Sequence, residues 1–201
     1  MKKIGSLFLT LCVILLVLSI LPIHGESAVY DRVLRLHVLA NSDSPRDQEL
    51  KLQVRDAVLA VTDPLLRDAV TREEAEAILG SNLPLLKATA EDTLRSLGSE
   101  DTVTVELGRE SYPTRTYARL AFPSGNYLSL RIRIGTGEGQ NWWCVLFPPM
   151  CLSAASEESA ADAFISVGFS DEQYRVITET DSLTYTARFK ILEVFEKHLG
   201  S

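Results

Sequence analysis

The residues best suited to chemistry are gathered in one stretch of the chain, which runs from Gly135 to Cys151. The stretch begins with three glycines at alternating positions, continues with the adjacent pair Trp142 and Trp143, and ends in an apolar run containing two prolines. It holds both tryptophans and two of the three cysteines of the chain. These residue types could supply a thiol nucleophile, a phosphate-binding turn, a disulfide or a surface for a protein partner.

Nucleophilic catalysis would use Cys144 as the thiol and His37 as its base. Asn41 or Asp43 would then have to orient the imidazole ring. The chain carries no local signature of such an enzyme, and Cys144 lies within an apolar run. Thiols in apolar surroundings are usually inert because burial disfavours the thiolate. The pattern therefore does not favour a thiol enzyme.

Cofactor and metal sites are also poorly supported. The glycine-rich segment follows a predicted strand, but neither a Lys-Ser/Thr pair nor an amphipathic helix comes after it, and Glu138 would repel a phosphate. The histidines show no spacing typical of metal ligands. They lie in three separate segments, at His24, His37 and His198. We therefore predict no metal and no cofactor.

Acidic side chains leave hydrolysis open as an alternative. Asp43 and Asp47 follow one predicted strand and Glu138 follows another, so the fold could bring these carboxylates together. Sequence spacing alone does not test that arrangement. Asp47 also has a simpler interpretation, because an acid belongs in the first turn of the helix that begins after Ser44.

The adjacent tryptophans favour a binding surface. In an extended strand, neighbouring side chains point to opposite sides, so Trp142 and Trp143 would lie on different faces. Tryptophan and arginine contribute strongly to protein contacts, and arginines follow the polar faces of the predicted strands. The alternative is that both indoles are buried.

Two long helices are predicted from capping residues and apolar spacing. The first begins at Ser44 and Pro45 and begins its exit at Pro64. The second begins with a capping box from Thr71 to Glu74 and stops at Gly98. Because Gly80 and Pro84 interrupt the second pattern, we expect a break or kink there. A last helix is expected from Asp181 or Ser182 to Leu199.

Alternating apolar residues predict four strands. They cover residues 33–40, 102–107, 115–122 and 127–134, and the turn residues 123–126 predict a hairpin between the last two. The order β-α-α-β-β-β-α predicts an α+β fold, with a mostly antiparallel sheet and the helices packed on one face. The opposite face would carry polar residues, namely Arg35, His37, Arg115, Arg119, Arg131 and Arg133.

The N-terminus and the charge indicate where the protein works. Residues 1–28 combine two lysines with an apolar run, as in a signal peptide, although a retained membrane anchor is also long enough. Residues 29–201 would then form a single extracytoplasmic α+β domain. The net charge of −7 argues against nucleic acid and anionic membrane surfaces as main partners. We expect membrane contact only through the N-terminal segment.

Export changes how the remaining cysteines are interpreted. Outside the cytoplasm, a disulfide between Cys144 and Cys151 can persist. It would close a short loop and stabilise the fold by roughly 2–3 kcal/mol in the chain-entropy model. The alternative is a pair of free, buried thiols, and the sequence leaves both open.

The chain resembles the stage II sporulation protein R family from about Asp31 to Cys151. The likeness rests on the segments 35–44 and 47–56, on Tyr112-Pro-x-Arg115 and Phe122-Pro-x-Gly125, and above all on the long motif 135–149. Residues 153–180 match nothing in the family pattern. The long motif is highly specific, and an export segment of the same kind precedes it.

The resemblance implies a secreted signalling protein rather than an enzyme. Such proteins are made in the forespore and exported to the space between the forespore and mother-cell membranes. There they switch on a membrane-embedded aspartic protease, which processes the precursor of sigma-E. The resemblance brings no catalytic residues, and the alternative remains a secreted cell-wall hydrolase using Glu138, Asp43 or Cys144. The candidate partner-binding residues are His37, Asn41, Asp43, Arg115, Arg131, Glu138, Asn141, Trp142 and Trp143.

Overall fold

The computed structural model describes most of the predicted extracytoplasmic domain. The described residues are 10–11, 29–117, 120–149, 164–165, 168–170 and 177. The predicted export segment 1–28, apart from residues 10 and 11, lies outside them, as do Arg119, Cys151 and the predicted last helix. Within these ranges, no helix combines the length and apolar character needed to span a membrane.

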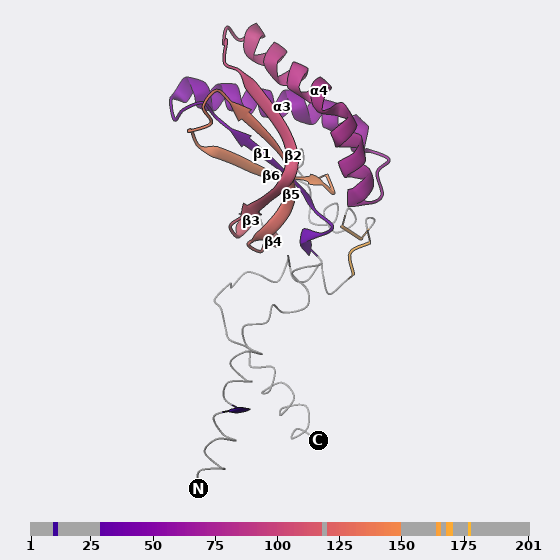
Figure 1. Ribbon diagram of the computed structural model, residues 1–201. Coiled ribbons are helices and arrows are strands. Elements are labelled where there is room, and N and C mark those ends of the chain that lie inside the picture. Colours follow the sequence, from indigo (N-terminus) through magenta and orange to yellow (C-terminus); the bar gives the residue numbers. More distant parts are fainter. Residues whose placement is uncertain are drawn as a thin grey trace.

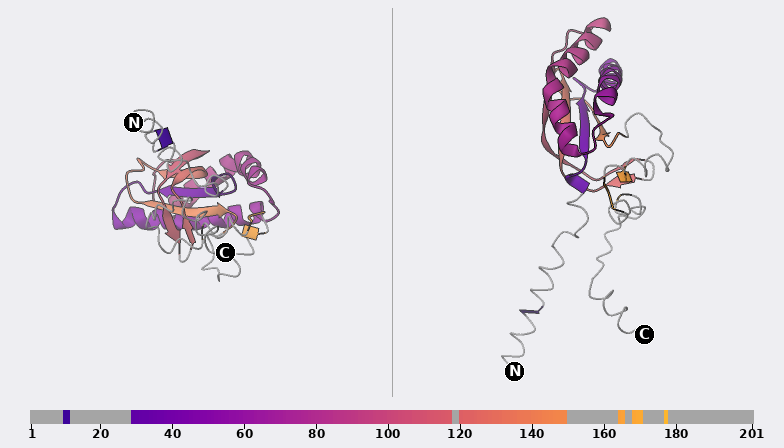
Figure 2. Two further views of the ribbon diagram at one scale, coloured as in Figure 1. Left: turned by 90° about the horizontal axis from the view of Figure 1, so that it is seen from below. Right: turned by 90° about the vertical axis from the view of Figure 1, so that its right-hand side faces the viewer.

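Within the described residues, two long helices and six strands confirm the predicted α+β class (Figure 1). The helices are α3 (Pro45–Leu66) and α4 (Arg72–Ser96), which pack against each other and run close together in the right-hand view of Figure 2. The strands are β1 (Leu34–Leu39), β2 (Val103–Tyr112), β3 (Arg115–Tyr117), β4 (Leu120–Phe122), β5 (Gly125–Ile134) and β6 (Asn141–Phe147).

Both helices begin where the sequence predicts. The Ser44 hydroxyl accepts a hydrogen bond from the backbone N–H of Asp47 at 3.1 Å, and Pro45 follows at the first helical position. The Thr71 hydroxyl accepts from the N–H of Glu74 at 3.2 Å, while the Glu74 carboxylate accepts from the N–H of Val70. These caps satisfy backbone donors that have no partner inside the helix.

The predicted break in the second helix is wrong, because α4 is continuous through Gly80 and Pro84. Leu79 and Leu86, on either side of the exposed proline, are fully buried in the same core. Their burial stabilises one continuous helix more than the missing proline N–H destabilises it. The carbonyl of Gly80, four residues before Pro84, is the one that loses its helical donor.

Replacing Pro84 with alanine is therefore expected to stabilise the protein by about 2 kcal/mol. The change removes the penalty of a proline inside a helix, about 3 kcal/mol for the lost hydrogen bond and the ring clash together, less about 0.4–1 kcal/mol for the freer unfolded chain. The measurement is urea unfolding followed by circular dichroism. Pro45→Ala is the matched control and should give no gain, since the N–H at the first helical position has no helical acceptor. A loss of stability in Pro84→Ala would contradict this account.

The main sheet has the strand order β2-β5-β1-β6. β1 runs parallel to β5, while β2–β5 and β1–β6 are antiparallel, so the sheet is mostly antiparallel as predicted. The predicted hairpin between 115–122 and 127–134 is wrong. β5 pairs instead along its whole length with β2, from Val103 opposite Ile134 to Tyr112 opposite Gly125.

The segment between β2 and β5 forms a small sheet of its own, in which β3 pairs with β4 (Figure 1). The reason lies in β2, which continues beyond Leu107 to Tyr112 and so provides ten residues to match the ten of β5. A full-length partner makes more ladder hydrogen bonds than the shorter segment that precedes the turn could.

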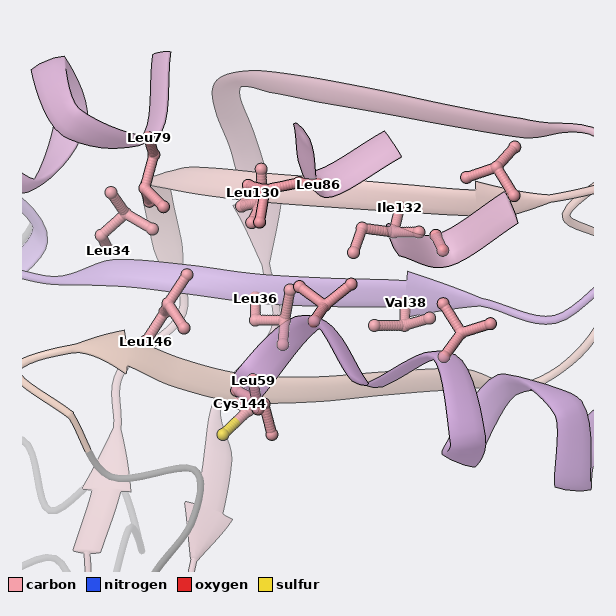
Figure 3. Close-up of a cluster of buried hydrophobic side chains, with 14 of the residues drawn as sticks. Leu34, Leu36, Val38, Leu59, Leu79, Leu86, Leu130, Ile132, Cys144 and Leu146 are labelled. Atoms are coloured by element: carbon pink, nitrogen blue, oxygen red, sulfur yellow. The ribbon is translucent and has the colours of Figure 1, made fainter. Parts of the chain in front are cut away.

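A separate hydrophobic core packs against each face of the main sheet. The core between the sheet and the helices contains Leu36, Val38, Leu130, Ile132 and Leu146 of the strands with Leu59, Leu79 and Leu86 of the helices (Figure 3). The core on the other side lies toward the end of the sheet that bears β3 and β4. It contains Val33, Tyr112, Phe122, Tyr127 and Val145, among others. We call this side, facing away from α3 and α4, the second face.

Candidate partner-binding surface

Strand register brings five of the predicted contact residues together on the second face. His37 of β1 stands opposite Arg131 of β5 and Trp143 of β6, so their side chains share one side of the sheet. Arg115 of β3 lies over Trp143, and Asn141 contacts His37. The second face therefore joins His37, Arg115, Arg131, Asn141 and Trp143 in one surface.

His37 is the polar centre of this surface. Its Nδ1 lies 2.8 Å from Oε1 of Glu110, and its Nε2 lies 2.8 Å from Oδ1 of Asn141. The residue is only 6% exposed, and its ring packs against Trp143 and Tyr112 with centroid distances of 5.4 Å and 6.2 Å. One ring nitrogen contacts Glu110 of β2 and the other contacts Asn141 at the start of β6. His37, which belongs to β1, therefore fixes these three strands relative to one another.

Glu110 links the histidine to a cation. Burial raises the pKa of Glu110, but the hydrogen bond from His37 and the attraction of His37 and Arg131 outweigh it, so the pKa lies below its usual 4.5. The nearest guanidinium nitrogen of Arg131 is 4.0 Å away, and Arg131 also pairs with Glu106. The carboxylate is thus stabilised in its charged form.

The lowered pKa predicts how stability depends on pH. A carboxyl group with a folded-state pKa below its unfolded value adds stability above the unfolded pKa and loses it as the pH falls. The free energy of unfolding of the wild-type protein should therefore fall below about pH 4.5. Between about pH 6 and pH 3, Glu110→Gln should lose less of its free energy of unfolding than the wild type does. Urea midpoints across this range are the measurement. Parallel curves for the two proteins would show that Glu110 does not contribute in this way.

The two tryptophans lie on opposite faces of β6, and each is stacked by an arginine. The Arg55 guanidinium of α3 lies 4.3 Å from the Trp142 ring centre, and the Arg115 guanidinium lies 3.7 Å from that of Trp143. Trp142 is 37% exposed and Trp143 is half-buried, so the alternative in which both are buried is wrong. Trp143 is the one that belongs to the second face.

Asn41 and Asp43 hold the glycine-rich loop rather than lining the second face. The Asn41 side-chain oxygen accepts from the N–H of Thr136 at 3.0 Å, and the Asp43 carboxylate accepts from the N–H of Gln140 at 2.8 Å. Glu138 is exposed, and its backbone N–H donates to the Asn41 carbonyl at 3.3 Å. These contacts join the loop after β1 to the loop before β6.

The glycines are required by this close approach of two loops. Gly135 and Gly137 have φ values of +56° and +70°, which favour glycine. A Cβ at Gly139 would overlap the backbone carbonyl of Ser42, and one at Gly135 would overlap the Asn41 side chain. The glycine motif is therefore explained by packing and not by phosphate binding.

Sequence reasoning missed Glu110, Tyr112, Lys51 and Arg55 as parts of these arrangements. The Lys51 ammonium is buried and donates to the carbonyl of Gln140 at 3.0 Å, which fastens the end of the glycine loop. Burial lowers the pKa of Lys51. Glu110 and Tyr112 could have been found by extending the alternation of β2 past Leu107, because both fall on its polar side.

The thiol and base proposed for nucleophilic catalysis are not assembled. Cys144 is buried in the helix-side core (Figure 3), whereas the His37 side chain is on the second face. Cys144 is disulfide-bonded, and the Cys144–Cys151 pairing stays a prediction because Cys151 lies outside the described residues. Asp43 is engaged by the loop. Among the described residues, no cluster of three metal-ligating side chains is present.

Comparisons with known proteins agree with the resemblance noted from the motifs. A family model described as Stage II sporulation protein R matches residues 30–157, which include every candidate contact residue. The Stage II sporulation protein R of Bacillus subtilis (strain 168) is 42% identical over 121 residues, covering 60% of this chain and 54% of that protein. The chain thus matches about half the length of this curated relative. No solved structure matches. The chain belongs to the stage II sporulation protein R family.

Proposed function

We propose that the chain is an exported activator that binds the extracytoplasmic side of a membrane-embedded aspartic protease of sporulation. Binding would trigger that protease to process the precursor of sigma-E. The protein would act between the forespore and mother-cell membranes, with residues 1–28 serving as signal peptide or anchor. The family, described as a sporulation protein and not as an enzyme, supports a role of this kind.

The observation that carries the proposal is the rigid display of Trp143 on the second face. The indole is half-buried, packed on His37 and Tyr112 and covered by Arg115. Tryptophan and arginine are the residues most often responsible for binding energy, and a side chain already held in place loses little entropy on binding.

An activator of this type must work through differential binding. A ligand shifts an equilibrium only as far as its affinity differs between the two states. The chain would therefore bind the active state of the protease more tightly than the inactive state. Because the His37 contacts fix three strands, the second face can act as a template for the active state without changing its own shape.

The experiment is co-production of the full chain, the protease and the sigma precursor in a cell that does not sporulate. Processing of the precursor is expected only when all three proteins are present. A protease with its catalytic aspartate replaced is the control, since it should abolish processing while leaving all three proteins in place. Absence of processing with the wild-type proteins, all present at normal levels and the chain exported, would overturn the proposal.

A further inference from the structure

Of the two arginines that stack on tryptophans in the part of the chain that the structure describes, one also pairs with an acidic side chain and the other does not. Arg55 stacks on Trp142 and also pairs with Asp56 at 2.7 Å. Arg115 stacks on Trp143, but within the described chain it makes no hydrogen bond and no ion pair, and its Nε is buried without an acceptor. One stack is thus complete within the chain and the other is not.

The Nε of Arg115 is buried within the chain, so an acceptor from another molecule can reach only the two terminal nitrogens of the guanidinium, which are not buried. Stacking occupies the flat side of a guanidinium and leaves its in-plane N–H groups for acceptors. A carboxylate is the acceptor that fits them best, because it can take two parallel hydrogen bonds from one guanidinium. The stack on Trp143 also holds the guanidinium in place before an acceptor arrives, which reduces the entropy lost on binding.

The charges around Arg115 also favour a carboxylate as its binding partner. The chain has a net charge of −7, yet Arg133 on the second face makes no ion pair in the described part; it donates to the Thr104 hydroxyl at 3.2 Å, and Glu106 interacts with it only at longer range. Arg131, in contrast, pairs with Glu106. Arg115 and Arg133 thus make no ion pair within the described part of an acidic protein, and this part of the face is complementary to an acidic partner.

We propose that Arg115, held on Trp143, is the anchor of the docking surface and binds a carboxylate in an acidic extracytoplasmic segment of the protease. This proposal rests on the proposed function and adds the chemistry of the contact. Arg133 would attract the same acidic segment at the edge of the surface. Arg55 and Trp142, on the opposite face of β6, have no part in the contact.

The test replaces Arg115 in the full chain and measures the fraction of precursor processed per amount of exported chain. Arg115→Glu is expected to reduce processing at least about tenfold, since a like charge would face the partner carboxylate. Arg115→Lys should retain part of the activity, because it keeps the charge but not the planar pair of donors. Arg55→Glu is the matched control and should stay within about twofold of wild type.

The outcomes separate this proposal from the proposed function. If the wild-type chain supports no processing, the function itself fails. If the wild type supports processing and exported Arg115→Glu does so equally well, only the anchor fails. If Arg115→Glu is not exported, Arg115→Gln replaces it, and unchanged processing by Arg115→Gln overturns the anchor.

A charge exchange identifies the partner group. Each acidic residue in the extracytoplasmic segments of the protease is replaced by arginine and combined with Arg115→Glu. One of these changes is expected to restore at least about half of the processing lost, because it recreates the ion pair in the opposite sense. Failure of every exchange would show that Arg115 does not bind a carboxylate of the protease.

Discussion

Gly139→Ala is expected to lower the free energy of unfolding by about 3 kcal/mol or more. The added Cβ would overlap the carbonyl oxygen of Ser42 and come within 3.0 Å of the Ala40 Cβ. Neither neighbour can turn away by a side-chain rotation, so the backbone must move. Such a move also lengthens the hydrogen bond from the Gly139 N–H to the Ala40 carbonyl, now 3.0 Å.

Gly108→Ala is the matched control, since a Cβ there meets no atom within 4 Å. It should change the free energy of unfolding by less than about 0.5 kcal/mol. Urea unfolding monitored by tryptophan fluorescence is suitable, because both indoles lie directly after the glycine loop. Equal stability of the two variants would mean that the loops after β1 and before β6 are not held together as described.

Arg35→Ala is expected to destabilise the fold by about 3–5 kcal/mol, as truncation of a large buried side chain does. Arg35 is 0% exposed, and its guanidinium lies 4.6 Å from the Tyr112 ring centre and 5.1 Å from those of Phe122 and Tyr127. Its Nε–H donates to the Cys144 carbonyl at 3.2 Å, which joins the second core to β6. Removing it leaves a cavity between aromatic rings.

Arg35→Met separates volume from charge. It should recover part of the loss, because a flexible apolar side chain fills the space without burying a charge. Arg95→Ala, on the exposed side of α4, is the control and should stay within about 0.5 kcal/mol of wild type. Thermal unfolding of the three variants measures this. If Arg35→Ala were as stable as Arg95→Ala, Arg35 would not organise the second core.

The elements could be predicted where local patterns decide them. Helix starts at Ser44 and Thr71 follow from caps that act within a few residues. The continuity of α4 could not be predicted, because burial of Leu79 and Leu86 against the sheet overrides the local effect of Pro84. Nor could the parallel pairing of β1 with β5, since no short-range signal specifies which distant strand is the neighbour.

In the candidate site too, local patterns predict some residues, and tertiary contacts determine the others. His37 and Trp143 are found from residue type and strand alternation, but Glu110 is missed because the predicted strand ends at Leu107, five residues before the end of β2. Asn41 was predicted to lie near a partner, and the structure shows that it bonds Thr136, which is 95 residues away. A polar side chain in a turn has the same appearance in the sequence whether it binds a partner or another loop. Only the tertiary contact distinguishes the two.

The central claim is that the second face, and not the helical side, meets the protease. The most direct measurement is photo-crosslinking in the co-producing cell, with a photoreactive phenylalanine placed at one position of the full chain. Arg133 is exposed on the second face, about 10 Å from the start of β6 by the spacing of two strands, and Leu85 is exposed on α4. We expect a crosslink to the protease from position 133 and none from position 85. A crosslink from position 85 alone would contradict the account.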